Sequence, residues 1–218
     1  MSKTTSLPSE PCKWLTAMSL ALCFVALSIF YVQFGYSSIS LLSAASFISA
    51  SVASLLFATA LSLGSINYFI GWPNLRHGYQ KQIGIMGFWW AVIYTITLPI
   101  LYPETYWYGL SDNIFTADVI LGSIALIVFG AMVLINSRLV APYFQLQTIF
   151  FVLGLGFIAY ALLVVRAILL EFNVWLLWLN TFNGFPPGKF TLSLIAITVL
   201  LLRVAVAIDK HRKLSHAS

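Results

Sequence analysis

The sequence predicts an all-α membrane protein, built as a bundle of six transmembrane helices with one short interfacial helix and with both termini in the cytoplasm. Three observations predict this fold class. The 218 residues are 61% hydrophobic and only 8% charged, whereas a soluble domain carries about 25% charged residues. Apolar runs long enough to cross a bilayer alternate with short polar connectors. Basic residues collect in every second connector, as membrane orientation requires.

The apolar runs give the positions of the six spans. No charge occurs between Lys13 and Arg76. This stretch is too long for one span of roughly 20 residues, and a polar break at residues 35–38 divides it in two. Glycine, proline and charged residues separate the later runs. The expected helices cover about residues 14–34, 41–69, 82–102, 117–135, 146–170 and 190–208, within one transmembrane domain at 14–208.

Three segments lie outside these spans. Residues 1–13 form an N-terminal cytoplasmic segment, and residues 209–218 form a basic cytoplasmic tail. The segment at 172–185 is too short to span and contains Trp175 and Trp178, side chains typical of the membrane–water boundary. It predicts a short interfacial helix, followed by a turn at residues 184–188.

Charge sets the expected orientation. Eight basic residues fall on one side of the six spans, against one certain base, Lys189, on the other. The basic side holds Lys3, Lys13, Arg76, Lys81, Arg138, Lys210, Arg212 and Lys213. The opposite side holds Glu104, Asp112, Asp118 and Glu171. Basic loops remain in the cytoplasm, so we expect both termini there and the chain in the plasma membrane of a bacterium.

A cleaved signal peptide is the competing interpretation of the first span. Its apolar run of about 20 residues exceeds the core of such a peptide, and no A-x-A cleavage site follows it. The first span is therefore expected to remain in the protein.

Several partners and chemistries are excluded. The net charge of +5 is spread over connectors instead of a solvated patch, so no nucleic-acid partner is expected. The expected partner is the lipid bilayer. Cys12 and Cys23 form no CxxC or metal-binding spacing, and no metal site is expected. No carboxylate pair or nucleophile–histidine pair falls within the spans, so no catalytic residue is assigned.

A few polar side chains fall inside the apolar runs. Arg166 and Arg203 are candidates for a functional role, because a charge within a membrane is costly. Both lie near the ends of their runs and can extend to the headgroups, which favours an anchoring role. Tyr94 and Tyr160 are expected to hydrogen-bond neighbouring helices.

Three stretches carry a resemblance to a known family. Residues 76–94 join a basic connector to an apolar helix, residues 121–138 open with Gly-x-x-Ala-Leu and close with Asn-Ser-Arg, and residues 146–166 form a further apolar helix. They are similar to the ferric-reductase-like transmembrane domain, a family that includes the haem subunit of a bacterial methionine sulfoxide reductase system. The resemblance covers roughly residues 40–208.

The resemblance implies that histidines on the third and fifth helices hold b-type haem and that electrons cross the membrane through it. At the matching positions this chain has Tyr94, Gln147 and Tyr160, so the expected axial histidines are missing. His77 precedes the third helix and is a weak candidate near the inner surface. We therefore expect no cofactor, with haem b present only if the family activity is retained.

These observations support three functional hypotheses. The first is a divergent, haem-free member of the family that acts as a membrane subunit or scaffold for a membrane or cytoplasmic protein partner. The alternative is an active membrane oxidoreductase, of ferric-reductase-like type, whose haem is held by atypical ligands or by a partner subunit. The third is a small transporter, against which stand the lack of an internal repeat and of a central acidic residue.

Overall fold

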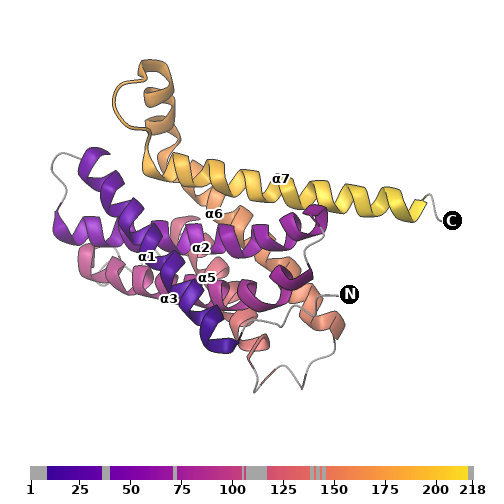
Figure 1. Ribbon diagram of the computed structural model, residues 1–218. Helices are drawn as coiled ribbons and strands as arrows, with labels where there is room; N and C mark the ends of the chain where they lie inside the picture. The colour runs from indigo at the N-terminus through magenta and orange to yellow at the C-terminus, as the bar shows by residue number, and fades with distance from the viewer. Residues whose placement is uncertain are drawn as a thin grey trace.

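The computed structural model describes residues 9–35, 40–70, 73–104, 106, 117–137, 140, 143 and 146–215, and its regular elements there are all helices. The helices are α1 (Glu10–Gly35), α2 (Leu41–Ile70), α3 (Pro73–Leu101), α5 (Ala117–Ile135), α6 (Leu146–Thr181) and α7 (Gly188–Ser215). They form one bundle, in which α2 and α3 lie side by side and run in opposite directions (Figure 1).

Most of these helices are long and apolar enough to cross a membrane. Five meet that description over Glu10–Gly35, Leu41–Ile70, Tyr79–Leu101, Gly154–Thr181 and Gly188–Lys213, and the apolar helix Val119–Ile135 is shorter. The prediction of an all-helical membrane protein is therefore confirmed for the described part of the chain. The count of six crossings and the cytoplasmic location of both termini stay predictions.

Several helices extend beyond the spans expected from hydropathy. α1 begins at Glu10, which forms an ion pair of 3.0 Å with Lys13 and places a negative charge at the helix N-terminus. α3 begins at Pro73, a residue that the first helical turn accepts because its missing N–H has no partner there. The basic connector before the third span, and the tail after residue 208 as far as Ser215, are therefore helical.

The interfacial segment requires a correction. Residues 172–181 do not form a separate helix, because α6 continues without a break from Leu146 to Thr181. No glycine or proline occurs between residues 171 and 181, so nothing in that stretch ends the helix. α6 ends where Phe182 and Gly184 adopt positive φ angles of 46° and 75°, the left-handed geometry that terminates many helices. This last part of α6 projects beyond most of the bundle (Figure 1), and the rings of Trp175 and Trp178 pack against Phe190 at the start of α7.

α2 lies inside the bundle, as its small residues predict. It contacts α1, α3, α6 and α7, and a larger share of it is buried than of the other long apolar helices. In lipid, the hydrophobic effect does not favour packing between helices, and small side chains let the helix backbones approach closely. A Cβ atom added to Gly87 of α3 would lie 3.2 Å from the Cβ atom of Leu56 of α2, which shows how closely these two backbones approach.

Contacts between distant residues show how the ends of the helices are arranged. At one end of the bundle, the Gln82 amide nitrogen donates to a Glu10 carboxylate oxygen at 3.1 Å, and the Tyr68 hydroxyl donates to Asp209 at 2.7 Å. At the other end, the Tyr31 hydroxyl donates to the Pro186 carbonyl. The start of α1 and the last turns of α7 therefore lie at the same end of the bundle. The side of the membrane that this end faces stays a prediction.

Candidate functional site: a half-open cavity with two cations

A cavity of about 660 Å³ lies between α2, α3, α5, α6 and α7. Its volume falls within the range of about 300–1,000 Å³ that is usual for small-molecule sites, and its lining is mostly apolar with a few polar groups, as in such sites. It is therefore the candidate functional site in the described part of the chain.

Small side chains explain why this space is not filled. The lining alanines and glycine are Ala50, Ala53, Ala91, Gly122, Ala125, Ala167 and Ala196. They come from all five helices around the cavity. Since neighbouring helices are held apart by larger side chains elsewhere, small residues facing one another leave a space between them.

The inner part of the cavity is apolar and well packed. Phe57 of α2 and Phe129 of α5 are stacked, with ring centroids 3.9 Å apart and an angle of 13° between the ring planes. Both belong to the main buried cluster of the bundle, together with Ala125 and Val199. This part of the lining lies at the middle of the helices and offers only hydrocarbon contacts.

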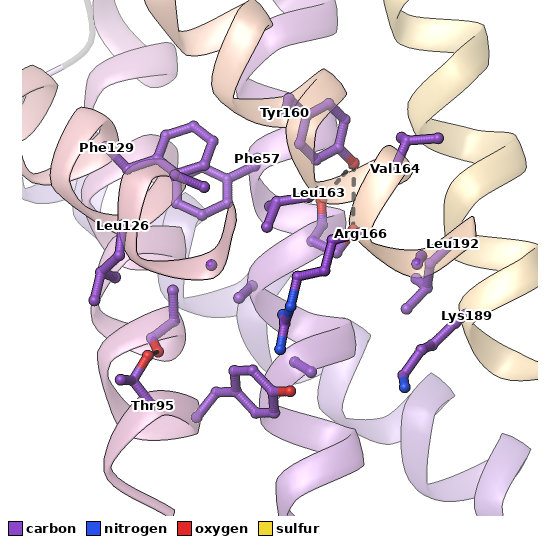
Figure 2. A pocket seen from close by; sticks show the side chains of 18 of the residues that line it. Phe57, Thr95, Leu126, Phe129, Tyr160, Leu163, Val164, Arg166, Lys189 and Leu192 are labelled. Atoms are coloured by element: carbon purple, nitrogen blue, oxygen red, sulfur yellow. Dashed lines mark hydrogen bonds between the residues drawn. The ribbon is translucent and has the colours of Figure 1, made fainter. Parts of the chain in front are cut away.

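Tyr160 adds a buried hydroxyl group at the edge of this inner part. Its side chain is 1% exposed, and its hydroxyl donates to the Ser54 backbone carbonyl at 3.0 Å and lies 3.3 Å from the Ser54 hydroxyl. The expectation that Tyr160 hydrogen-bonds a neighbouring helix is confirmed. The contact fixes α6 to α2, and Figure 2 shows both hydrogen bonds at the upper edge of the cavity.

The charged side chains of the cavity lining lie on the side opposite Tyr160. Of the described residues in the lining, Arg166 and Lys189 are the charged ones, and Figure 2 shows both side chains reaching to the side opposite Tyr160. A Cβ atom added to Gly122 would lie 3.6 Å from the guanidinium carbon of Arg166. The guanidinium group therefore packs against the backbone of α5, inside the bundle.

The two arginines of the apolar runs thus occupy different places. Arg166 faces the cavity, whereas Arg203 is exposed on α7 with its guanidinium carbon 4.9 Å from the ring centroid of Phe157. The sequence favoured an anchoring role for both. The exposed position of Arg203 is consistent with an anchoring role. Because Arg166 faces the cavity, it is a candidate binding residue.

Lys189 is held at the mouth of the cavity by an ion pair. Its ammonium nitrogen lies 2.7 Å from a carboxylate oxygen of Glu171, with the two side chains 44% and 26% exposed. The pair joins the later part of α6 to the start of α7. An ammonium group has three N–H donors, so this contact leaves two of them for other acceptors.

The structure brings together two of the four residues suggested by the family resemblance. Tyr94 and Tyr160 line the same cavity. Gln147 lies in the first turn of α6, roughly 20 Å along the helix axis from Tyr160 at 1.5 Å per residue. His77 lies in α3, roughly 25 Å from Tyr94 by the same rise. The four positions therefore do not form one site.

Among the described residues, the lining holds few of the side-chain types that ligate haem iron. Haem iron takes histidine, methionine, cysteine or tyrosine as axial ligands, and among the described lining residues only three tyrosines, Tyr94, Tyr106 and Tyr160, are of these types. The hydroxyl of Tyr160 is already engaged by Ser54. No group of three or more His, Cys, Asp or Glu side chains suited to a metal ion occurs among the described residues either.

Sequence reasoning missed the cavity itself. Phe57 and Phe129 were not singled out, because nothing in a single apolar run shows which of its faces meets a space, and Lys189 was considered only for the orientation of the chain. The one usable signal was the run of small residues in α2, of which Ala50 and Ala53 line the cavity. Small residues favour close packing between helices, and α2 packs closely against α3.

Comparisons with known proteins leave the family open. No protein-family model matches the chain, and no curated protein matches it at a significant level. The class that the fold defines is a polytopic helical membrane protein.

Proposed function

We propose that this chain is a six-span plasma-membrane protein of ferric-reductase-like type that lacks haem and acts as a membrane subunit or scaffold. The observation that carries the proposal is the Tyr160–Ser54 contact. At a position where the family has a haem ligand, this chain has a buried tyrosine whose hydroxyl joins two helices. A side chain used in this way stabilises the bundle and does not face a metal.

The rest of the donor set supports the same conclusion. Tyr94 is the other ligand position that reaches the cavity, and a neutral phenol is a poor ligand for haem iron compared with histidine. The remaining positions, Gln147 and His77, are each roughly 20 Å or more along their helices from the tyrosines. Electron transfer through a haem therefore has no matched ligand pair in the described lining.

A scaffold also needs a surface that a partner can reach. The last turns of α7 extend past the other helices (Figure 1) and expose Lys210, His211, Arg212 and Lys213. In the proposed orientation this basic surface lies in the cytoplasm, beside the headgroups. It is the place where a cytoplasmic partner with an acidic surface would bind.

The visible absorption spectrum tests the proposal. The protein is expressed with ample haem, purified in detergent, and measured oxidised and then reduced with dithionite. We expect no Soret band in either state, and none after haemin is added to the purified protein and the excess is removed. A near-stoichiometric Soret band that shifts on reduction would overturn the proposal in favour of an active oxidoreductase, and the variants Tyr94→Phe, Tyr160→Phe and His77→Ala would then identify the ligand.

A further inference from the structure

We propose that the cavity binds an amphipathic acid, a lipid-like molecule with a hydrocarbon tail and a carboxylate or phosphate headgroup. This inference goes beyond the scaffold role and does not depend on the family to which the bundle belongs. It rests on the polarity of the cavity, on the placement of Arg166 and on the shape of the apolar part.

The cavity lining changes from charged on one side to apolar on the other. Its charged side chains, Arg166 and Lys189, reach to the side opposite Tyr160 (Figure 2), and Lys189 is the second residue of α7. Its aromatic residues Phe57 and Phe129 lie at the middle of their helices. A bilayer leaflet changes from charged to apolar over the same interval, so a lipid can enter with its headgroup at Arg166 and its tail towards Phe129.

Arg166 is suited to an acidic headgroup. A guanidinium group carries five N–H donors in a planar fork that matches a carboxylate or a phosphate in two-point contact. Arg166 lines the cavity, and its guanidinium group lies beside Gly122 of α5. A headgroup that enters this space can therefore form charge-assisted hydrogen bonds with the fork.

Lys189 adds a second cation on the same side of the cavity. It lies with Arg166 on the side opposite Tyr160 (Figure 2), and its ammonium nitrogen is 2.7 Å from a carboxylate oxygen of Glu171. Because Lys189 is paired with Glu171, the two lining cations and this carboxylate together carry one net positive charge, which is complementary to an anionic headgroup. A cation or a zwitterion would not gain from this arrangement.

The apolar part of the cavity suits a tail. Its walls are alanine side chains and the stacked pair of Phe57 and Phe129, which present smooth hydrocarbon surface. The cavity is partly open, so a tail longer than the enclosed space can continue outside it.

Native mass spectrometry of the full-length protein in detergent tests this proposal. Two acids are each paired with a neutral or zwitterionic counterpart: oleate with oleyl alcohol, and phosphatidylglycerol with phosphatidylcholine. We expect at least one acid to bind as a single copy and to be preferred over its counterpart. The acid that does so identifies the source of the headgroup, a free fatty acid or a phospholipid.

Variants show whether the binding is in this cavity. Arg166→Gln should weaken acid binding by about tenfold or more, since a charged hydrogen-bond partner is lost. Leu126→Trp, which fills the lining, should weaken binding of the tail. Arg203→Gln removes the matched intramembrane arginine outside the cavity and should leave binding unchanged.

Any of three results would overturn the proposal. Acids could bind no better than their counterparts, Arg166→Gln could bind like the unchanged protein, or Arg203→Gln could lose as much binding as Arg166→Gln. If Arg166→Gln fails to fold, the comparison of each acid with its counterpart on the unchanged protein, together with Leu126→Trp, still decides the question. A Soret band in the absorption experiment would overturn the scaffold role, whereas the preference for an acid and its loss in Arg166→Gln are measured on haem-free protein and test the cavity ligand separately.

Discussion

The hydroxyl of Tyr160 on α6 donates a 3.0 Å hydrogen bond to the backbone carbonyl of Ser54 on α2. That carbonyl lies within a helix, so the tyrosine adds a second partner to an acceptor that has two lone pairs. The contact connects the two parts of the bundle formed by α2 with α3 and by α5 with α6, which are the most extensive helix pairs.

Replacing Tyr160 with phenylalanine tests the energetic value of this contact. We expect Tyr160→Phe to lower the free energy of unfolding by about 0.5–1.5 kcal/mol, the range for hydrogen bonds between membrane helices. The measurement is a reversible unfolding titration in mixed micelles. Ser54→Ala removes the serine hydroxyl and keeps the carbonyl, so its effect should be smaller. A larger loss in Ser54→Ala than in Tyr160→Phe would contradict this assignment.

Two glycines of α6 provide a matched pair for the packing of α5 against α6. A Cβ atom at Gly156 would lie 2.5 Å from the Met132 sulfur, whereas one at Gly154 meets nothing within 4 Å. We expect Gly156→Val to lower the free energy of unfolding by about 1 kcal/mol more than Gly154→Val, because only the former overpacks the interface and the flexible Met132 side chain relieves part of the strain. Both variants replace glycine by valine within α6, so the change in helix propensity is the same in each. Equal losses in both variants would show that α5 and α6 do not pack in this register.

The Lys189–Glu171 ion pair should contribute little to stability on its own. Both side chains are partly exposed, and such pairs stabilise by about 0.2–1 kcal/mol. A double-mutant cycle with Lys189→Gln and Glu171→Gln should give a coupling energy in that range, and it should decrease as salt is added. The exchange variant Lys189→Glu with Glu171→Lys should recover the coupling energy. A coupling energy of zero at low salt would mean that α6 and α7 are not joined here.

The class of fold could be predicted because composition and hydropathy can be read directly from the order of residues in the chain. Long apolar runs with few charges have only one stable environment, and the helices are found where those runs are. The exact ends were harder to predict. Hydropathy marks where a helix leaves the hydrocarbon, whereas the end of the helix itself depends on residues such as Pro73 and Gly184.

The candidate site was predictable only in part. Tyr94, Tyr160 and Arg166 were singled out because burying a polar side chain within an apolar run costs free energy. All three line the cavity. The cavity depends on which faces of five helices meet, and helices that are apolar on every side carry no periodic signal for that. Phe57 and Phe129 lie on α2 and α5, with α3 between them in the chain, so they could not be paired from the sequence.

The measurement that tests the account most directly is the sidedness of two engineered cysteines in intact cells. Cys12 and Cys23 are exposed free thiols, so both are first replaced by alanine. In that background an impermeant thiol reagent should label Ser111→Cys from outside, and should label Ser215→Cys only after the membrane is opened. This result would establish the proposed orientation, with the Arg166 side of the cavity facing outward. Labelling of Ser215→Cys from outside, with Ser111→Cys protected until the cells are opened, would contradict it.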